Sequence, residues 1–176
     1  DLVQFTLQNS IKGFENLSLI PGSVGASPIQ NIGAYGADVS SLIDSVECFD
    51  LKKNKLIHLT NTECDFSYRS SALKNSSLFI QSINFRVDES RVLNFEYKSI
   101  KAYMSSNDID VNQLTSDSLS KIVTDIRKSV LPNHNKIFNA GSFFKNPVIN
   151  KDIINFHVHK ESELVIWDID NNLVKV

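Results

Sequence analysis

The stretch "IPGSVGASPIQNIGAYG", residues Ile20 to Gly36, holds most of the glycine in this 176-residue chain. Five of the six glycines lie between Gly13 and Gly36. Glycine permits a positive φ angle and a close approach of a ligand to the main chain, and successive N–H groups can surround an anion such as a pyrophosphate. Tight loops also use glycine for turns, so the glycine count alone leaves ligand binding and a packed loop as two open interpretations.

The spacing of these glycines does not match two common nucleotide-binding loops. The chain has no G-x-x-x-x-G-K-[ST] sequence, and no G-x-G-x-x-G between an expected strand and an expected helix. A net charge of −2, without a basic patch among aromatic residues, argues against nucleic acid as a partner. No apolar run approaches the roughly 18 residues that cross a membrane, no signal peptide opens the chain, and no obligate protein partner is evident.

Cysteine and histidine residues give no sign of a metal site. Cys48 and Cys64 have neither metal-ligand nor redox spacing, which is typical of a cytosolic protein with free thiols that serve as small apolar side chains. "HVHK" would place His157 and His159 on one face of a strand, but no third candidate ligand lies at a spacing typical of a metal site. We therefore expect no bound metal.

Alternating apolar residues predict several antiparallel strands. The expected strands cover residues 43–50, 55–60 and 77–88, with a turn at 52–54 and a C-terminal hairpin within 163–176. Residues 1–12 are expected to form a short helix that ends at Gly13.

The longest expected helix lies within residues 111–133, where Pro132 ends it and Ser116 or Asp117 caps it. One face carries the apolar residues Leu119, Ile122, Val123, Ile126 and Val130. Antiparallel strands with a few helices indicate an α+β fold, in which helices flank a mixed or antiparallel sheet.

Three blocks of this sequence, in order, closely resemble the UDP-N-acetylenolpyruvoylglucosamine reductase (MurB) family. They are "GFENLSLIPGSVGASPIQNIGAYG" at residues 13–36, "FSYRSSALK" at 66–74 and "NAGSFFKNPVI" at 139–149. The resemblance extends over residues 2–176 and favours the longer type of the family, which bears a tyrosine loop. It implies part of a PCMH-type FAD-binding fold, with residues 1–130 in the FAD-binding domain and residues 131–176 at the start of the substrate-binding domain.

The resemblance implies an FAD-dependent oxidoreductase that uses NADPH. Its reaction would be the reduction of UDP-N-acetylglucosamine enolpyruvate to UDP-N-acetylmuramate in bacterial peptidoglycan synthesis. Such an enzyme acts in the cytoplasm on a UDP-sugar and serves cell wall biogenesis, cell shape and cell division. The alternatives are an FAD- or nucleotide-binding module without catalysis, and another flavin oxidoreductase of the PCMH type.

In the family, the main chain of the glycine-rich block lies along FAD, near the isoalloxazine and pyrophosphate groups. By resemblance, the cofactor contacts are Ile20, Pro21, Gly22, Ser27, Ile29, Ile32 and Gly33. Small residues are expected there because a Cβ would collide with the cofactor. Gly25, Tyr35 and Gly36 are explained as readily by turns and packing.

Two residues match catalytic positions of the family. Arg69 in "YRSS" matches the active-site arginine, whose guanidinium would bind the enolpyruvyl carboxylate and the enolate that develops from it. Ser142 in "AGSFFKN" matches the serine that gives a proton. Apart from the resemblance, a lone arginine is most often part of a structural or surface ion pair, and a serine is most often a solvated or capping hydroxyl.

Three further residues are assigned to substrate binding by the resemblance, namely Tyr97, Asn146 and Lys145. Phe95 competes with Tyr97 for the position of the family's substrate-covering tyrosine, and a core aromatic at the end of a strand is the alternative. Val130 stands where the family usually has a lysine that contacts the substrate's phosphates, and Arg127 or Lys128 is the alternative source of charge.

The ends of the chain differ from what the family leads one to expect. The chain opens on Asp1 inside an expected helix and ends at Val176 in a strand-like stretch. The family's glycine-rich pyrophosphate loop and its catalytic glutamate have no counterpart here. We therefore expect a central fragment that lacks the N-terminal flavin lobe and the C-terminal glutamate region, and that is inactive by itself.

Overall fold

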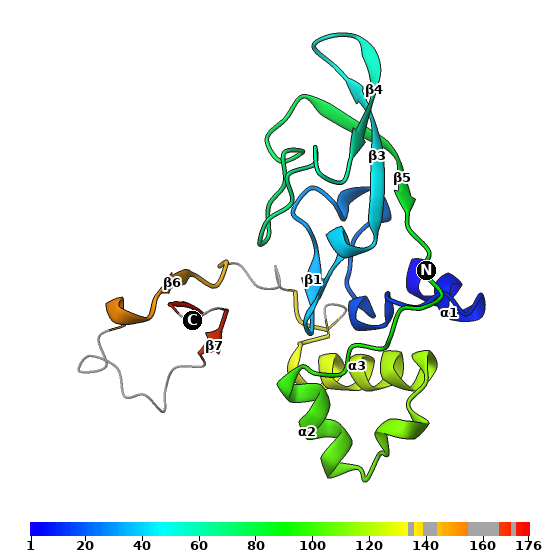
Figure 1. Cartoon of the computed structure of the whole chain (residues 1–176), viewed down its shortest axis with the longest axis vertical. Helices are drawn as coiled ribbons and strands as arrows, with labels where there is room; N and C mark the ends of the chain where they lie inside the picture. The colour runs from blue at the N-terminus through cyan, green and yellow to red at the C-terminus, as the bar shows by residue number, and fades with distance from the viewer. Residues whose placement is uncertain (134–135, 139–143, 155–165, 170–171) are drawn as a thin grey trace. The chain divides into compact units, whose positions relative to one another are not determined.

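The computed structural model describes residues 1–133, 136–138, 144–154, 166–169 and 172–176. The chain divides into two compact units, residues 1–137 and residues 138–176, and each unit is described by itself (Figure 1). The assignment of residues 1–130 to FAD binding and of residues 131–176 to substrate binding stays a prediction.

A three-stranded antiparallel sheet, in the order β4–β3–β5, forms one end of the first unit (Figure 1). Its strands are β3 (Ile43–Asp50), β4 (Lys55–Thr60) and β5 (Leu78–Phe85). Asn54, with a φ angle of +50°, lies in the tight turn between β3 and β4. The predictions of these strands are confirmed, although β5 is shorter than residues 77–88.

The first hydrophobic core packs against this sheet. Its buried residues are Phe14, Leu17, Val39, Leu42, Ile43, Val46, Cys48, Cys64 and Leu73. Phe14 precedes the 3-10 helix η1 (Glu15–Leu17), and its ring meets that of Phe85 edge to face, with centroids 5.3 Å apart. Ile20 and Ile32 pack against the same core. Burial of each apolar side chain stabilises the fold by ~1.5–3 kcal/mol, so the core attaches the glycine-rich segment to the sheet.

A short antiparallel hairpin follows the glycine-rich loop. Its strands are β1 (Gly33–Ala34) and β2 (Ala37–Asp38), with the 3-10 helices η2 (Val24–Ala26) before it and η3 (Val39–Ser41) after it. The turn residues Tyr35 and Gly36 have φ angles of +50° and +81°. Two positive φ angles give a tight turn whose twist suits antiparallel strands. Strands of two residues are too short for an alternating pattern, so the sequence does not predict this hairpin.

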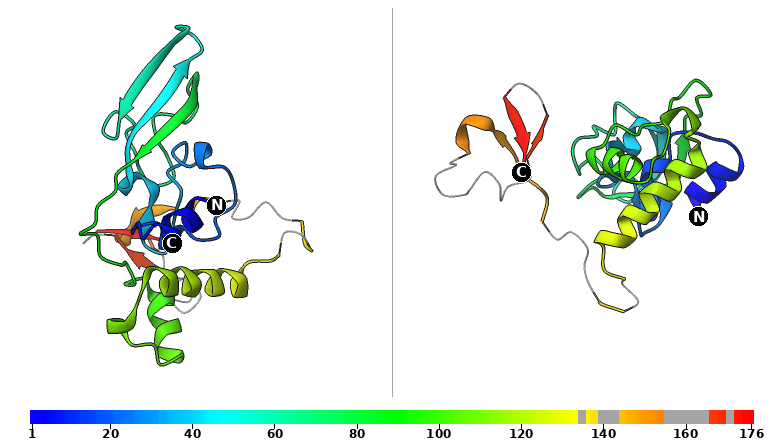
Figure 2. Two further views of the ribbon diagram at one scale, coloured as in Figure 1. Left: turned by 90° about the vertical axis from the view of Figure 1, so that its right-hand side faces the viewer. Right: turned by 90° about the horizontal axis from the view of Figure 1, so that it is seen from below.

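Two helices form the other end of the first unit (Figure 2). They are α2 (Lys98–Ser106) and α3 (Ser116–Val130), joined through the 3-10 helix η4 (Val111–Gln113). Their contact forms a second core, whose buried residues are Ile100, Met104, Leu119, Ile122, Val123 and Ile126. The prediction of α3 is confirmed, whereas α2 is not predicted, because Ile100 and Met104 give it only a single helical repeat of buried apolar residues.

Two details of α3 differ from the prediction. The N-cap is Thr115 rather than Ser116 or Asp117, because the Thr115 hydroxyl accepts the Ser118 N–H while the Ser118 hydroxyl accepts the Thr115 N–H. Val130, expected on the buried face, is 67% exposed because the helix ends at this residue and its buried face stops earlier.

Buried polar contacts connect the glycine-rich segment with the helical end of the unit. The Asn16 side-chain amide donates to the carbonyls of Tyr35 and Asn94, both at 2.8 Å. The buried hydroxyls of Ser18 and Ser120 bond to each other at 2.7 Å. These contacts join residues that are far apart in the sequence, so they depend on the complete fold of the unit.

The N-terminal helix α1 (Leu2–Gln8) is shorter than the predicted helix. The Asn9 side chain donates to the Phe5 carbonyl at 2.8 Å, and Ser10 then adopts a φ angle of +56°. The prediction that the helix ends at Gly13 is wrong, because the chain already turns at Asn9 and Ser10.

The second unit contains a small antiparallel sheet in the order β6–β8–β7. Its elements are β6 (Val148–Asn150), the 3-10 helix η5 (Lys151–Ile153), β7 (Trp167–Asp168) and β8 (Leu173–Lys175). The pairing of β7 with β8 confirms the predicted C-terminal hairpin, of which residues 170–171 lie outside the described residues.

Candidate functional site

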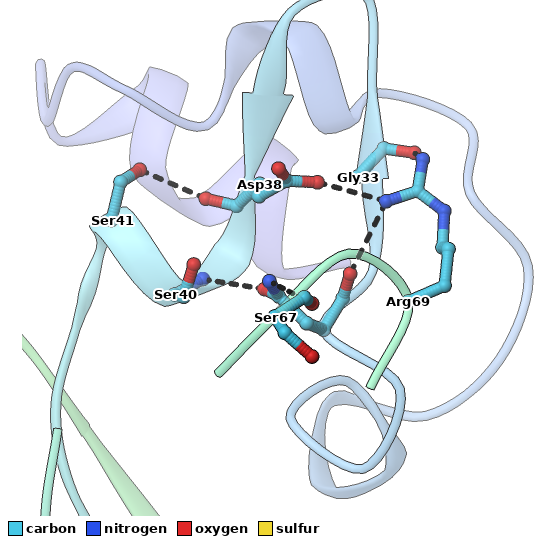
Figure 3. A network of polar contacts seen from close by, with 7 residues as sticks. Gly33, Asp38, Ser40, Ser41, Ser67 and Arg69 are labelled. Carbon is cyan, nitrogen blue, oxygen red and sulfur yellow. Dashed lines mark hydrogen bonds and ion pairs between the residues drawn. The ribbon is translucent and has the colours of Figure 1, made fainter. Parts of the chain in front are cut away.

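Arg69 lies in a tight turn between Ser67 and Ser70, whose main chains exchange hydrogen bonds of 3.0 and 3.2 Å. Its φ angle is +54°, a left-handed conformation that is uncommon for residues other than glycine. Such conformations persist where surrounding contacts enforce them, and they are enriched at functional sites. The turn brings the Arg69 side chain to the β1–β2 hairpin (Figure 3).

Three residues of the hairpin region hold the Arg69 guanidinium (Figure 3). Nη1 donates to Asp38 Oδ1 at 2.8 Å and to the Asn31 carbonyl at 3.4 Å, and Nη2 donates to the Gly33 carbonyl at 2.6 Å. The guanidinium carbon also lies 5.1 Å from the centre of the Tyr68 ring. With 30% of its surface exposed, the Arg69 side chain is anchored and still accessible to solvent.

Asn31 connects the arginine turn to the hairpin. Its buried side chain donates to the Ser67 carbonyl at 3.1 Å and accepts the Ser40 N–H at 3.0 Å. Nearby, the Ser71 hydroxyl donates to the Ile29 carbonyl at 2.8 Å. The structure therefore brings together the predicted flavin segment and the predicted catalytic arginine.

Gly33 lacks a side chain for a reason within the protein itself. A Cβ at this position would overlap Asp38 Oδ1, and would lie 2.7 Å from the Ala37 carbonyl and 2.8 Å from Arg69 Nη1. The arginine and its acidic partner already fill that space, so the absence of a side chain at Gly33 does not require a cofactor, and contact of Gly33 with FAD stays a prediction.

Gly22 and Gly25 are different, because among the described residues, their own chain neighbours apart, no heavy atom lies within 4 Å of the places where their Cβ atoms would stand. Gly22 also has a φ angle of +111°, which favours glycine. The buried Ser27 hydroxyl forms no hydrogen bond with any residue that the structure describes. Open space along the main chain and an unpaired hydroxyl fit a ligand lying along this segment, as FAD is expected to lie.

The remaining predicted cofactor contacts fall into two pairs. Pro21 and Ile29 are exposed to solvent. Ile20 and Ile32 are partly buried against the first core. The second pair anchors the segment at its two ends, and residues 21–26 between them are exposed to solvent.

Tyr97 lies at the N-cap of α2 and not at the end of a strand, and its side chain packs against the second core as the alternative expects of a core aromatic. Its ring meets the Tyr35 ring edge to face, with centroids 5.4 Å apart. Burial raises the pKa of Tyr35, and the positive charge of Arg127 opposes that rise. Phe95, the competing candidate, also packs against the second core. Tyr97 thus contacts the turn of the hairpin, whereas Arg69 contacts its base.

The other predicted site residues belong to the second unit. Ser142 lies outside the described residues, as do His157 and His159. Lys145 is exposed and Asn146 is partly buried. Their roles in catalysis and substrate binding stay predictions.

The described part of the chain lacks two further features. No group of three or more His, Cys, Asp or Glu side chains there could hold a metal ion. No helix in that part is long and apolar enough to cross a membrane.

A shallow, open pocket of about 400 Å³ lies beside η3. Its lining residues are Ser40, Ser41, Asn61, Thr62, Asp65 and Phe66. None of the predicted site residues lines it, so this pocket is separate from the arginine contacts.

The sequence alone does not single out Asp38 or Asn31. One signal points to Asp38, which is the first acidic residue after Glu15 and ends the uncharged stretch of residues 16–37. A carboxylate that is drawn from water needs a cation or hydrogen-bond donors nearby. The sequence does not show which cation pairs with the Asp38 carboxylate, because the partner, Arg69, lies 31 residues away.

A solved structure defines the class of this fold. The crystal structure of the UDP-N-acetylenolpyruvylglucosamine reductase (MurB) from Thermus caldophilus matches 83% of this chain and 44% of its own length, with a TM-score of 0.58 and 21% identity. At this level of identity the likeness shows the fold alone. The chain therefore has an α+β architecture that forms part of a PCMH-type FAD-binding fold, and the predicted fold class is confirmed.

Sequence comparisons show the family. A scan against models of protein families found no match. The UDP-N-acetylenolpyruvoylglucosamine reductase of Bdellovibrio bacteriovorus is 41% identical in an alignment of 176 positions that covers 97% of this chain and 51% of that protein. The protein of the same name from Neisseria meningitidis serogroup C is 43% identical in an alignment of 155 positions that covers 86% of this chain and 44% of that protein. The chain belongs to this reductase family, and it spans about half the length of the curated relatives it matches.

Proposed function

We propose that this chain contributes flavin-binding and substrate-binding residues to the NADPH-dependent, FAD-linked reduction of UDP-N-acetylglucosamine enolpyruvate to UDP-N-acetylmuramate. The reaction would serve peptidoglycan synthesis in the bacterial cytoplasm. The names of the matched relatives support the reaction. The observation that carries the proposal is the contact between Arg69 and Gly33, because it unites the expected arginine with the expected flavin segment.

Arg69 is the residue that we assign to the enolpyruvyl carboxylate. A guanidinium stays charged at physiological pH and donates parallel hydrogen bonds to a carboxylate. Its Nη atoms are already engaged, but its Nε–H forms no hydrogen bond with any residue in the described part of the chain. A carboxylate bound at this exposed edge would be held next to a fixed positive charge, which also stabilises negative charge that develops during reduction.

The loop before the hairpin is the part that we assign to FAD. Gly22 and Gly25 leave their main chain uncovered, and Ser27 offers a hydroxyl without a partner among the described residues. A bound FAD would supply hydride transfer between NADPH and the enolpyruvyl group. In the proposal Tyr97 covers the substrate, Lys145 and Asn146 contact its diphosphate, and Ser142 donates the proton.

The test is a chimera in which this chain replaces the matching half of the Bdellovibrio bacteriovorus reductase. We expect the chimera to bind FAD and to oxidise NADPH only when the enolpyruvyl UDP-sugar is present. Arg69→Ala should lower kcat/KM by about a hundredfold or more, since a charged group beside the developing charge is removed.

Arg86→Ala is the matched control. Arg86 pairs with Asp44 at 3.5 Å, and both side chains are more than half exposed, so its loss should leave turnover unchanged. A chimera that folds and binds FAD but reduces no substrate would contradict the proposal and favour a flavin-binding module without catalysis.

A further inference from the structure

Within the described part of the chain, the Arg69 guanidinium makes its hydrogen bonds through its two Nη atoms. Its Nη atoms donate to Asp38, Asn31 and Gly33, whereas Nε–H has no acceptor among the described residues. Figure 3 shows Nε on the side of the group that faces away from Asp38. Three of the five N–H bonds therefore restrain the group, and the edge with Nε–H is left for another acceptor.

The hairpin supplies two of these acceptors from one pair of facing residues. Gly33 on β1 is paired in register with Asp38 on β2. A main-chain carbonyl and a carboxylate therefore stand side by side, opposite Nη2 and Nη1. The guanidinium fits against this pair because residue 33 has no side chain.

We propose that Asp38 is a positioning residue, which fixes the rotation of the Arg69 guanidinium so that Nε–H faces an anionic ligand. In the proposed reaction this ligand is the enolpyruvyl carboxylate, so the identity of the ligand rests on the proposed function. The restraint of Arg69 by Asp38 does not rest on it, because the restraint follows from the contacts alone.

Asp38 has two effects on an anion at Arg69, and they oppose each other. Its negative charge weakens the attraction of the anion, whereas its Oδ1 holds the guanidinium in place. The Asp38 side chain is 46% exposed, so solvent screens its charge and the geometric effect dominates. Asp38→Asn keeps an oxygen acceptor and removes the charge, whereas Asp38→Ala removes both. Comparing the two variants therefore distinguishes the effect of the Asp38 hydrogen bond on the guanidinium position from the effect of the Asp38 charge.

The first measurement is NMR of the arginine side chains in the 176-residue chain. The chain has four arginines, so their signals can be assigned one by one. In the wild type and in Asp38→Asn, rotation of the Arg69 guanidinium should be slow and the Nη signals separate. Asp38→Ala should merge them. The matched control is Asp44→Ala, whose carboxylate pairs with Arg86 and should leave the Arg69 signals unchanged.

The second measurement is a titration with the enolpyruvyl UDP-sugar, followed at Arg69 Nε–H. Affinity should fall about tenfold in Asp38→Ala and less than about threefold in Asp38→Asn, as expected for one lost restraint on a charge-assisted hydrogen bond. Circular dichroism verifies that each variant is folded. If Asp38→Ala does not fold, Asp38→Glu replaces it, because its longer side chain should shift the Arg69 signals while keeping the charge.

The outcomes separate this proposal from the proposed function. Unchanged Nη signals in folded Asp38→Ala would overturn the positioning role, and so would tighter binding in both variants. Merged Nη signals in Asp38→Ala, in a chain that does not bind the UDP-sugar even as wild type, would support the restraint and contradict the proposed function.

Discussion

Gly33 and Arg69 are so close that residue 33 has no room for a side chain. The Gly33 carbonyl accepts a hydrogen bond of 2.6 Å from Nη2, and a Cβ on Gly33 would stand 2.8 Å from Nη1. The glycine and the arginine lie in separate blocks of the sequence, so each constrains what the other block can contain. This relation leads to the first prediction.

Gly33→Ala should lower the free energy of unfolding by ~1–3 kcal/mol, the usual cost of forcing an extra carbon into a filled space. Urea unfolding followed by circular dichroism measures the change. Gly25→Ala is the matched control and should change stability by less than about 0.5 kcal/mol, because its Cβ would meet open space. Equal effects of the two substitutions would contradict the crowding at Gly33.

Asn16→Ala should destabilise the first unit by ~2–3 kcal/mol. The Asn16 amide donates to the Tyr35 and Asn94 carbonyls while Asn16 itself is 2% exposed, so its removal leaves two acceptors without their partner. Thermal unfolding of the chain measures the loss. Asn107→Ala provides the comparison, because that amide donates to a carbonyl of its own helix in an exposed position and should matter little. A loss for Asn16→Ala no larger than for this exposed asparagine would be contrary to the structure.

The two thiols should resist labelling in the folded chain. Cys48 and Cys64 are free and fully buried members of the first core, as expected for small apolar side chains. Burial raises the pKa of both thiols, that of Cys64 to about 11, so at pH 8 the reactive thiolate is scarce as well as covered. An aromatic disulfide reagent at pH 8 should label neither thiol until urea is added. Rapid labelling of either thiol without urea would show that this core opens.

Asp50 should make stability depend on pH. The N–H groups of Lys53 and Lys52 donate to its carboxylate, and these bonds hold the pKa of Asp50 below its ordinary value of 3.8. A lowered folded-state pKa means that the carboxylate stabilises the fold above about pH 4, and that this contribution is lost as pH falls through the folded-state pKa. Asp50→Asn should therefore be less stable than the wild type at pH 7.

The measurement for Asp50 is urea unfolding of both chains across the acid range. The difference between them should shrink as the pH falls below about 4. Other carboxylates with lowered pKa values, such as Glu63 and Asp88, are present in both chains and cancel in the difference. A difference in the free energy of unfolding that stays constant with pH would mean that the charge on Asp50 does not contribute to stability.

Local patterns were enough to predict the longer elements of this fold. An alternation of apolar residues depends only on neighbouring positions, and it correctly predicts β3 and β4. The helical period likewise predicts α3, but not its end effects, since the cap is Thr115 and Val130 is exposed. Caps and helix ends depend on one or two residues, so small differences between neighbouring residues decide where a helix begins and ends.

By itself, the sequence determined the α+β class, the family and the candidate residues Arg69 and Gly33. Composition, apolar periodicity and sequence motifs are enough for this, because each can be read from short stretches of the chain. Only the tertiary structure decided that Asp38 is the partner of Arg69, and that Gly33 is bare because these two side chains fill its space. The physical reason is that Arg69 lies 31 positions from Asp38 and 36 from Gly33 in the sequence, and no local pattern records which distant side chains the folded backbone will bring together.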